Sequence, residues 1–70
     1  MEFSERFKTL KNERGLTYRD VSRQLGINER AVQYYAQGKR FPDFKGLLLL
    51  ADFFEVSIDY LVGRSDIPNW

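Results

Sequence analysis

The sequence predicts an all-α fold of five short helices in a single domain. Two features of the pattern support this fold class. Apolar residues recur at intervals of three and four, and capping residues or glycine stand at the ends of these stretches. A length of 70 residues allows one domain with a modest core. We expect this domain at residues 1–64 and an irregular tail at residues 65–70.

The first helix is predicted at about residues 2–13. Phe3, Phe7 and Leu10 follow the i, i+4 and i+7 spacing of one helical face, and Arg14-Gly15 ends the helix. Three basic residues of the first two helices are expected to face solvent: Arg6, Lys8 and Arg23.

The second predicted helix carries the first half of a helix-turn-helix pattern. Thr17 can cap this helix, and its apolar face is Val21 and Leu25. Ser22 is small at the point where a neighbouring helix would approach. Gly26 then permits the left-handed backbone that ends a helix.

The third predicted helix completes that pattern. Ile27 is expected to fill the core, and Asn28 to cap a helix that buries Val32 and Tyr35 and ends at Gln37-Gly38. In a helix-turn-helix the second helix of the pair enters a DNA major groove. A plain helical hairpin needs a similar pattern, so the spacing alone leaves both interpretations open.

The fourth and fifth helices follow a basic loop at residues 38–42, whose proline is well placed just before a helix. Asp43 is expected to cap a helix that runs to about residue 54 or 55, and Ser57 to cap a short helix at residues 58–62. The core face of the fourth helix is expected to hold Leu47, Leu50, Ala51 and Phe54.

Composition excludes several classes of function. Cysteine and histidine are absent, which removes disulfides, the usual zinc sites and thiol or imidazole catalysis. We therefore expect no metal, no cofactor and no enzymatic activity, in a chain suited to a reducing cytoplasm. The longest apolar run, residues 47–51, is far too short to span a membrane, and the charged start lacks a signal peptide's apolar segment. No membrane partner is expected.

Charge is distributed unevenly along the chain. The net charge is only +1, but residues 1–40 hold nine Lys/Arg against five Asp/Glu, and residues 41–70 hold two against five. The helix-turn-helix lies in the basic half. This pattern favours a basic DNA-binding face opposite an acidic face over a chance asymmetry of a solvated surface.

The order of the apolar, capping and loop residues resembles the phage-repressor/Cro-like (xenobiotic-response-element type) helix-turn-helix family over about residues 3–63. Two segments are especially similar to the family, at residues 38–42 and 56–63. The other residues that carry the resemblance are Phe7, Leu10, Gly15, Leu16, Thr17, Val21, Leu25, Gly26, Ile27, Val32, Tyr35, Leu47, Leu50, Ala51 and Phe54. The resemblance implies a lambda-repressor-like domain that binds double-stranded DNA sequence-specifically, usually as a dimer on a palindromic operator.

The resemblance also implies a DNA-binding surface, residue by residue. Its members are Tyr18, Arg19, Asn28, Glu29, Arg30, Gln33, Tyr34, Gln37, Lys39 and Arg40. Tyr18 stands where the family commonly has glutamine; it can donate to a phosphate but cannot make a bidentate amide contact. Lys11 and Ala36 stand where the family often pairs an arginine with a glutamate, and Tyr35 replaces the usual tryptophan or leucine. Without that partner, Lys11 can either lie over the core or reach toward the DNA backbone.

The individual roles follow from side-chain chemistry. Arg30 can contact guanine O6 and N7, which we favour over a solvated helix arginine. Glu29 can accept from cytosine N4 or simply stabilise a helix N-terminus. Tyr34 can contact a thymine methyl group or a phosphate, or pack beside Tyr35. Asn28 is first a cap, and the N–H groups beside it can hold a phosphate. The phosphate candidates are Arg19, Lys39 and Arg40.

A second predicted surface is apolar and lies in the acidic half. Leu49 points away from the core face of the fourth helix, and three residues add apolar surface nearby: Phe53, Ile58 and Val62. We expect a homodimer seam here, with packing by Trp70 and the tail as the alternative. Neither Leu49 nor Ile58 is assigned to the core, so we expect charges at both positions to leave the domain folded.

The function favoured by these patterns is a bacterial or phage transcriptional regulator, a repressor that blocks polymerase at its operator. The alternative is an antitoxin or another protein-interaction module, or the head of a larger parent chain, that uses the apolar face of the fourth and fifth helices.

Overall fold

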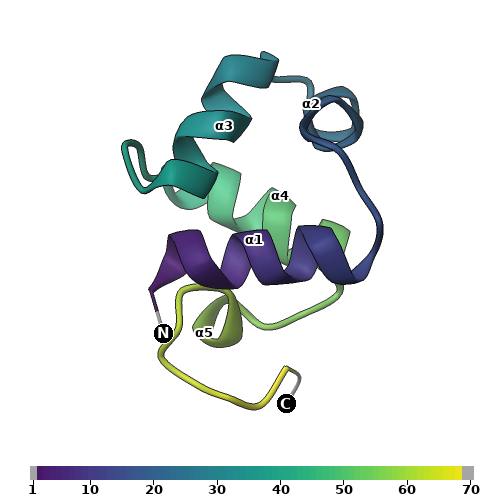
Figure 1. Ribbon diagram of the computed structural model, residues 1–70. Coiled ribbons are helices and arrows are strands. Elements are labelled where there is room, and N and C mark those ends of the chain that lie inside the picture. The colour runs from purple at the N-terminus through teal and green to yellow at the C-terminus, as the bar shows by residue number, and fades with distance from the viewer. Residues whose placement is uncertain (1, 69–70) are drawn as a thin grey trace.

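The computed structural model describes residues 2–68, which form five helices and no strand, as the sequence predicts. The helices are α1 (Phe3–Glu13), α2 (Tyr18–Leu25), α3 (Glu29–Gln37), α4 (Phe44–Phe54) and α5 (Ile58–Leu61). Figure 1 shows α2 and α3 on one side of α1, and α5 with the C-terminal segment on the other side. None of the helices in these residues has the length and apolar character needed to cross a membrane.

An aromatic junction occupies the centre of the core. Phe7 of α1 is fully buried, and its ring meets the edges of Tyr35 and Phe54 at centroid distances of 6.3 Å and 6.0 Å. Phe3 stacks on Phe7 one turn earlier, at 5.8 Å. Edge-to-face pairs of this kind add to the stabilisation from apolar burial. The junction therefore joins α1, α3 and α4 at one point.

The core face predicted for α4 is confirmed at three of its four positions. Leu50, Ala51 and Phe54 are buried, whereas Leu47 is only partly buried and packs against the edge of the core. The helix ends at Glu55, which adopts a left-handed backbone with φ 58°. That conformation is uncommon for residues other than glycine. Here it lets the Val56 N–H reach the Ala51 carbonyl at 3.0 Å.

Arg14 ties the end of α1 to the end of α4. Its guanidinium donates a hydrogen bond to the Phe54 carbonyl and lies 5.6 Å from the centroid of the Phe54 ring. A cation at a helix C-terminus favourably opposes the partial negative charge of the unpaired carbonyls. This single contact spans 40 residues of sequence.

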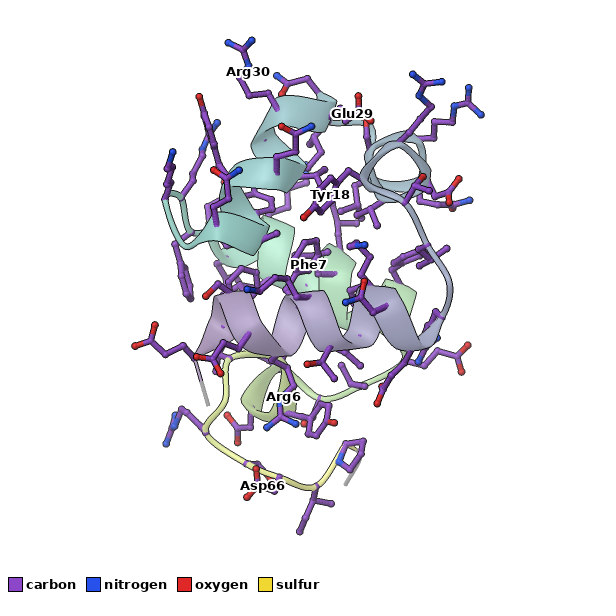
Figure 2. All side chains as sticks on the ribbon, viewed as in Figure 1. Arg6, Phe7, Tyr18, Glu29, Arg30 and Asp66 are labelled. Carbon is purple, nitrogen blue, oxygen red and sulfur yellow. The ribbon has the colours of Figure 1, made fainter. Side chains whose placement is uncertain are left out.

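The expectation that Arg6 faces solvent is wrong. Arg6 is only 5% exposed, and its guanidinium lies 3.7 Å from the centroid of the Tyr60 ring. The same group donates to the Ser65 carbonyl and to Asp66 Oδ1, each at 3.2 Å. Figure 2 shows Arg6 and Asp66 below α1, beside α5 and the C-terminal segment. The long apolar stem of arginine allows this burial while its head pairs with polar atoms.

The described part of the tail, residues 65–68, contains no helix and is held against the domain. Besides the Arg6 contacts, the Ser57 N–H donates to the Pro68 carbonyl at 2.7 Å. The Ser65 N–H donates to the Asp59 carbonyl at 3.2 Å. Trp70, which was considered as a packing residue, lies outside the described residues.

We predict that Arg6→Ala lowers the free energy of unfolding by about 2–3 kcal/mol, because it removes a buried stem, a stacked guanidinium and the hydrogen bonds that this charged group donates. Urea denaturation followed by circular dichroism measures this loss. Asp66→Ala is the matched control. Its side chain is 97% exposed, so its loss should cost less than about 1 kcal/mol. Equal costs for the two variants would contradict this account of Arg6.

Candidate nucleic-acid interface

The turn between α2 and α3 is held by Ser22 and Gly26. The Ser22 carbonyl accepts from the N–H groups of Gly26 at 3.0 Å and Ile27 at 3.3 Å, and the Ser22 hydroxyl donates to the Ile27 carbonyl. Gly26 has φ 67°, which glycine adopts without strain. Ser22 was predicted only as a small residue at the helix approach. Because Ser22 both accepts and donates hydrogen bonds across the turn, it fixes the angle between the two helices.

Buried residues lock α2 and α3 onto the core. Val21 and Val32 are fully buried, and Tyr35 and Ala36 are also buried. Leu25 and Ile27 are only partly buried and pack against the same cluster from either side of the turn, so Ile27 covers the core rather than filling it. Because its inner face is fixed in this way, α3 presents its opposite face in one orientation.

The start of α2 carries a complete capping box. The Asp20 N–H donates to Thr17 Oγ1 at 3.1 Å, and the Thr17 N–H donates to Asp20 Oδ2 at 2.8 Å. The backbone N–H of Thr17, then its side chain, holds the pKa of Asp20 below its ordinary value, and Arg23 adds a smaller effect. Thr17 was predicted as the cap, whereas the reciprocal role of Asp20 was missed. A Thr-x-x-Asp pattern before an apolar stretch is a signal that could have revealed it.

The outer face of α3 contains the residues predicted to read bases. Asn28 Oδ1 accepts from the Ala31 N–H at 2.8 Å, so Asn28 acts as the predicted cap. Arg30 and Gln37 are exposed, and Glu29, Gln33 and Tyr34 are partly buried. Figure 2 shows Glu29 and Arg30 at the end of the molecule opposite Arg6 and Asp66, with Arg30 pointing away from the body. The structure thus groups the predicted α3 residues on one accessible face.

The basic loop begins directly at the end of α3. The N–H groups of Lys39 and Arg40 both donate to the Tyr34 carbonyl, at 3.0 Å and 3.4 Å. The Lys39 ammonium lies 6.0 Å from the centroid of the Tyr34 ring, and both basic side chains are exposed. The backbone bonds to α3 place these two cations beside the outer face of that helix.

Tyr18 is partly buried rather than fully displayed. It packs against the core, and the Lys11 ammonium lies 4.8 Å from the centroid of its ring. Lys11 also donates to the Leu16 carbonyl at 3.1 Å and to Asn12 Oδ1 at 3.0 Å. Of the two roles considered for Lys11, these contacts support packing over the domain rather than a reach toward DNA. Arg19, next to Tyr18, is exposed.

The predicted dimer seam is uneven in exposure. Leu49 is 44% exposed, but Phe53, Ile58 and Val62 are partly buried, and Phe53 and Ile58 pack against the core. The expectation that Ile58 can accept a charge without affecting the fold is therefore wrong. Further apolar exposure on α4 comes from Phe44 and Leu48, which are not among the four predicted seam residues.

Comparisons with known proteins agree with this geometry. Residues 2–61 match the sequence profile of a family described as a helix-turn-helix domain. A crystal structure of a transcriptional regulator from Listeria innocua is 40% identical and superposes with a TM-score of 0.85, covering 89% of this chain and 58% of that one. The HTH-type transcriptional regulator YqaE of Bacillus subtilis is 37% identical over 60 residues, which are 86% of this chain and 52% of that relative.

Two further relatives have names that state a direction of regulation. The transcriptional activator BcrR of Enterococcus faecalis is 30% identical over 96% of this chain and 33% of its own. The phage CTXphi transcriptional repressor RstR of Vibrio cholerae is 30% identical over 91% of this chain and 57% of its own. The chain thus spans between a third and three fifths of the length of these regulators.

We predict that Asp20→Asn lowers the free energy of unfolding at neutral pH and that this cost disappears in acid. The lowered folded pKa means that the carboxylate stabilises the fold above its ordinary pKa of 3.8, and that this stability is lost as the pH falls through the lower folded value. Urea denaturation at a series of pH values measures the difference from the wild type.

Thr17→Val is the control for this prediction, because the hydroxyl acceptor that it removes does not depend on ionisation. Its cost should remain at low pH. An Asp20→Asn cost of equal size at neutral pH and at about pH 2 would show that the charge does not contribute.

Proposed function

The chain belongs to the helix-turn-helix family of transcriptional regulators, and from this premise we propose that it binds operator DNA with α3 in the major groove. The observation that carries the proposal is the division of α3 into two faces. One face is locked by Val32 and Tyr35 in the core, and the other presents Arg30, Gln33 and Gln37 outward. A recognition helix needs both a fixed orientation and a polar face free to meet base edges.

The flanks of α3 supply the phosphate contacts in this proposal. Lys39 and Arg40 are attached to the end of α3 through the Tyr34 carbonyl, and Arg19 is exposed in the first turn of α2. Charges at these positions fix the register of the helix on the duplex without reading sequence. Tyr18 has a packing role through its ring, so any phosphate contact from Tyr18 is limited to its hydroxyl.

Two copies on a palindromic operator complete the proposal. A single domain of this size offers too small an interface for tight specific binding, and a two-fold pair doubles it. We place the seam around Leu49, the most exposed of the four predicted seam residues, with Phe53, Ile58 and Val62 at its margin. Such a seam repeats the same patch on both subunits.

We propose repression as the regulatory outcome, because a dimer that covers the operator excludes polymerase without any further contact. Activation needs a surface that contacts polymerase as well. The similar proteins BcrR, an activator, and RstR, a repressor, represent both outcomes. A reporter gene under a promoter that contains the selected binding site distinguishes them: repression lowers its expression, and increased expression would contradict this part of the proposal.

We predict that Arg30→Ala weakens binding to the selected operator by about 1–3 kcal/mol per contact and relaxes the preference at one base pair of each half-site. Selection of bound sites from random DNA, followed by titration of single-base variants, measures both effects. Unchanged base preferences would identify Arg30 as a surface arginine without a reading role.

Arg40→Ala is the matched control for this experiment. It should weaken binding to all sequences about equally, because Arg40 is assigned to a phosphate. It should also make the slope of log affinity against log salt shallower by about one for each lost contact, from a dimer slope of roughly −4 to −8. A flat salt dependence of the wild type would contradict DNA binding itself.

We predict that Leu49→Glu dissociates the dimer and lowers operator affinity while the domain stays folded, because Leu49 is exposed and lies outside the core cluster. Analytical ultracentrifugation and circular dichroism measure the two properties. Phe44→Glu is the control, since it adds the same charge to α4 at a residue that is 69% exposed and outside the proposed seam.

Dissociation by Phe44→Glu but not by Leu49→Glu would place the interface on the face of α4 that carries Phe44 and Leu48. A wild-type protein that is monomeric at high concentration would contradict the dimer. The exposed apolar residues of α4 would then favour the second candidate function, a protein-interaction module such as an antitoxin.

A further inference from the structure

A cavity of about 470 Å³ lies between the helix-turn-helix and α4. Leu25 and Ile27 line it on either side of the turn, Tyr35 lines it from α3, and Leu49 and Leu50 line it from α4. Its volume falls within the range of about 300–1,000 Å³ that is usual for small-molecule sites. The walls are about equally apolar and polar, so the cavity suits an organic ligand that carries both an apolar ring and a polar group.

The rim of the cavity is positively charged. Arg40 and Lys45 both line it and are exposed, and neither forms an ion pair within residues 2–68. Asp43 also lies at the rim, but its Oδ1 accepts from the Gly46 N–H at 2.8 Å and is engaged at the start of α4. The two cations and one carboxylate give the rim a net positive charge, which favours an anionic ligand.

We propose that this cavity binds a small planar aromatic carboxylate. The ring would occupy the space between Tyr35, Phe41 and Leu49, three of the residues that line the cavity, because aromatic rings pack favourably against one another. The carboxylate would meet Arg40 and Lys45 at the rim, where a guanidinium fork matches its geometry. An uncharged ligand of the same shape loses this second set of contacts.

Such a ligand would also lower the affinity for DNA, a consequence that rests on the function proposed above. Arg40 is shared between the rim and the phosphate contacts, so a bound carboxylate competes with phosphate for the same cation. The ligand also contacts the turn and the inner side of α3, whose positions fix the recognition face. Binding at this cavity therefore couples to DNA binding through shared residues.

The test titrates 2-naphthoate into the full chain without DNA, followed by amide chemical shifts in NMR spectra. We expect saturable shifts at Ile27, Tyr35 and Leu49. The uncharged analogue 2-naphthamide should bind about five- to tenfold more weakly, because it loses two exposed ion pairs worth at most about fivefold each. The absence of saturable shifts, or equal affinity for both compounds, would overturn the proposal.

Lys45→Gln tests the rim without altering a residue assigned to DNA binding. It should weaken 2-naphthoate binding by about two- to fivefold and leave 2-naphthamide binding unchanged. Lys8→Gln, which removes an exposed lysine of α1 away from the cavity, should change neither. Equal effects of the two substitutions would overturn the assignment of the rim. Leu49 also belongs to the proposed dimer seam, so a second copy and the ligand compete at this residue, and the titration is made at a protein concentration at which the chain is monomeric.

A separate titration with operator DNA tests the coupling. Saturating 2-naphthoate should weaken operator binding by the wild type, and unchanged operator affinity would overturn the regulatory consequence. If the protein binds 2-naphthoate as expected but no DNA at any salt concentration, the ligand site stands and the function proposed above fails. The two proposals are therefore distinguishable.

Discussion

The contact of Phe7 with Tyr35 and Phe54 is the constraint on which the rest of the domain depends. These three rings belong to α1, α3 and α4, and Phe7 meets each of the other two edge to face at about 6 Å. Tyr35 is the part of the junction that matters for DNA, because it anchors the inner face of α3. The positions of the Tyr34 side chain and of the basic loop depend on this anchor, because the N–H groups of the loop donate to the Tyr34 carbonyl. The position of the proposed phosphate contacts is thus set from the centre of the core.

The features that could be predicted from sequence are those set by residues close together in the chain. Four helices start at a residue whose side chain accepts a hydrogen bond from the backbone N–H three positions later: Thr17, Asn28, Asp43 and Ser57. The residue type at each position is therefore enough to predict where the helix starts. Gly26 and Gly38 mark two helix ends for the same local reason. The apolar periodicity then assigns the buried faces. These signals were sufficient to predict the fold and the face of α3 that points outward.

The features that were missed depend on residues far apart in the chain. Arg6 meets its partners 59 and 60 positions later, and no pattern around Arg6 distinguishes it from a solvated helix arginine. Phe53 and Ile58 were expected at a free surface because they lie off the predicted core stripe. In this small domain, however, both residues pack against the core and are partly buried. The left-handed backbone of Glu55 was missed for another reason. The end of the helix imposes this conformation, and the type of residue at position 55 does not indicate it.

The basic half of the sequence overstates the charge that is available to DNA. Residues 1–40 hold nine Lys/Arg, but three of them donate side-chain hydrogen bonds inside the domain. Arg6 pairs with Asp66, Lys11 binds the Leu16 carbonyl, and Arg14 binds the Phe54 carbonyl. The other six form no ion pair within residues 2–68: Lys8, Arg19, Arg23, Arg30, Lys39 and Arg40. Under the proposed function, the positive charge available to DNA therefore comes from a few exposed cations around α2, α3 and the basic loop, while the remaining positive charge stabilises the fold. Charge asymmetry along a short chain becomes an argument for DNA binding only after the cations engaged inside the domain have been subtracted.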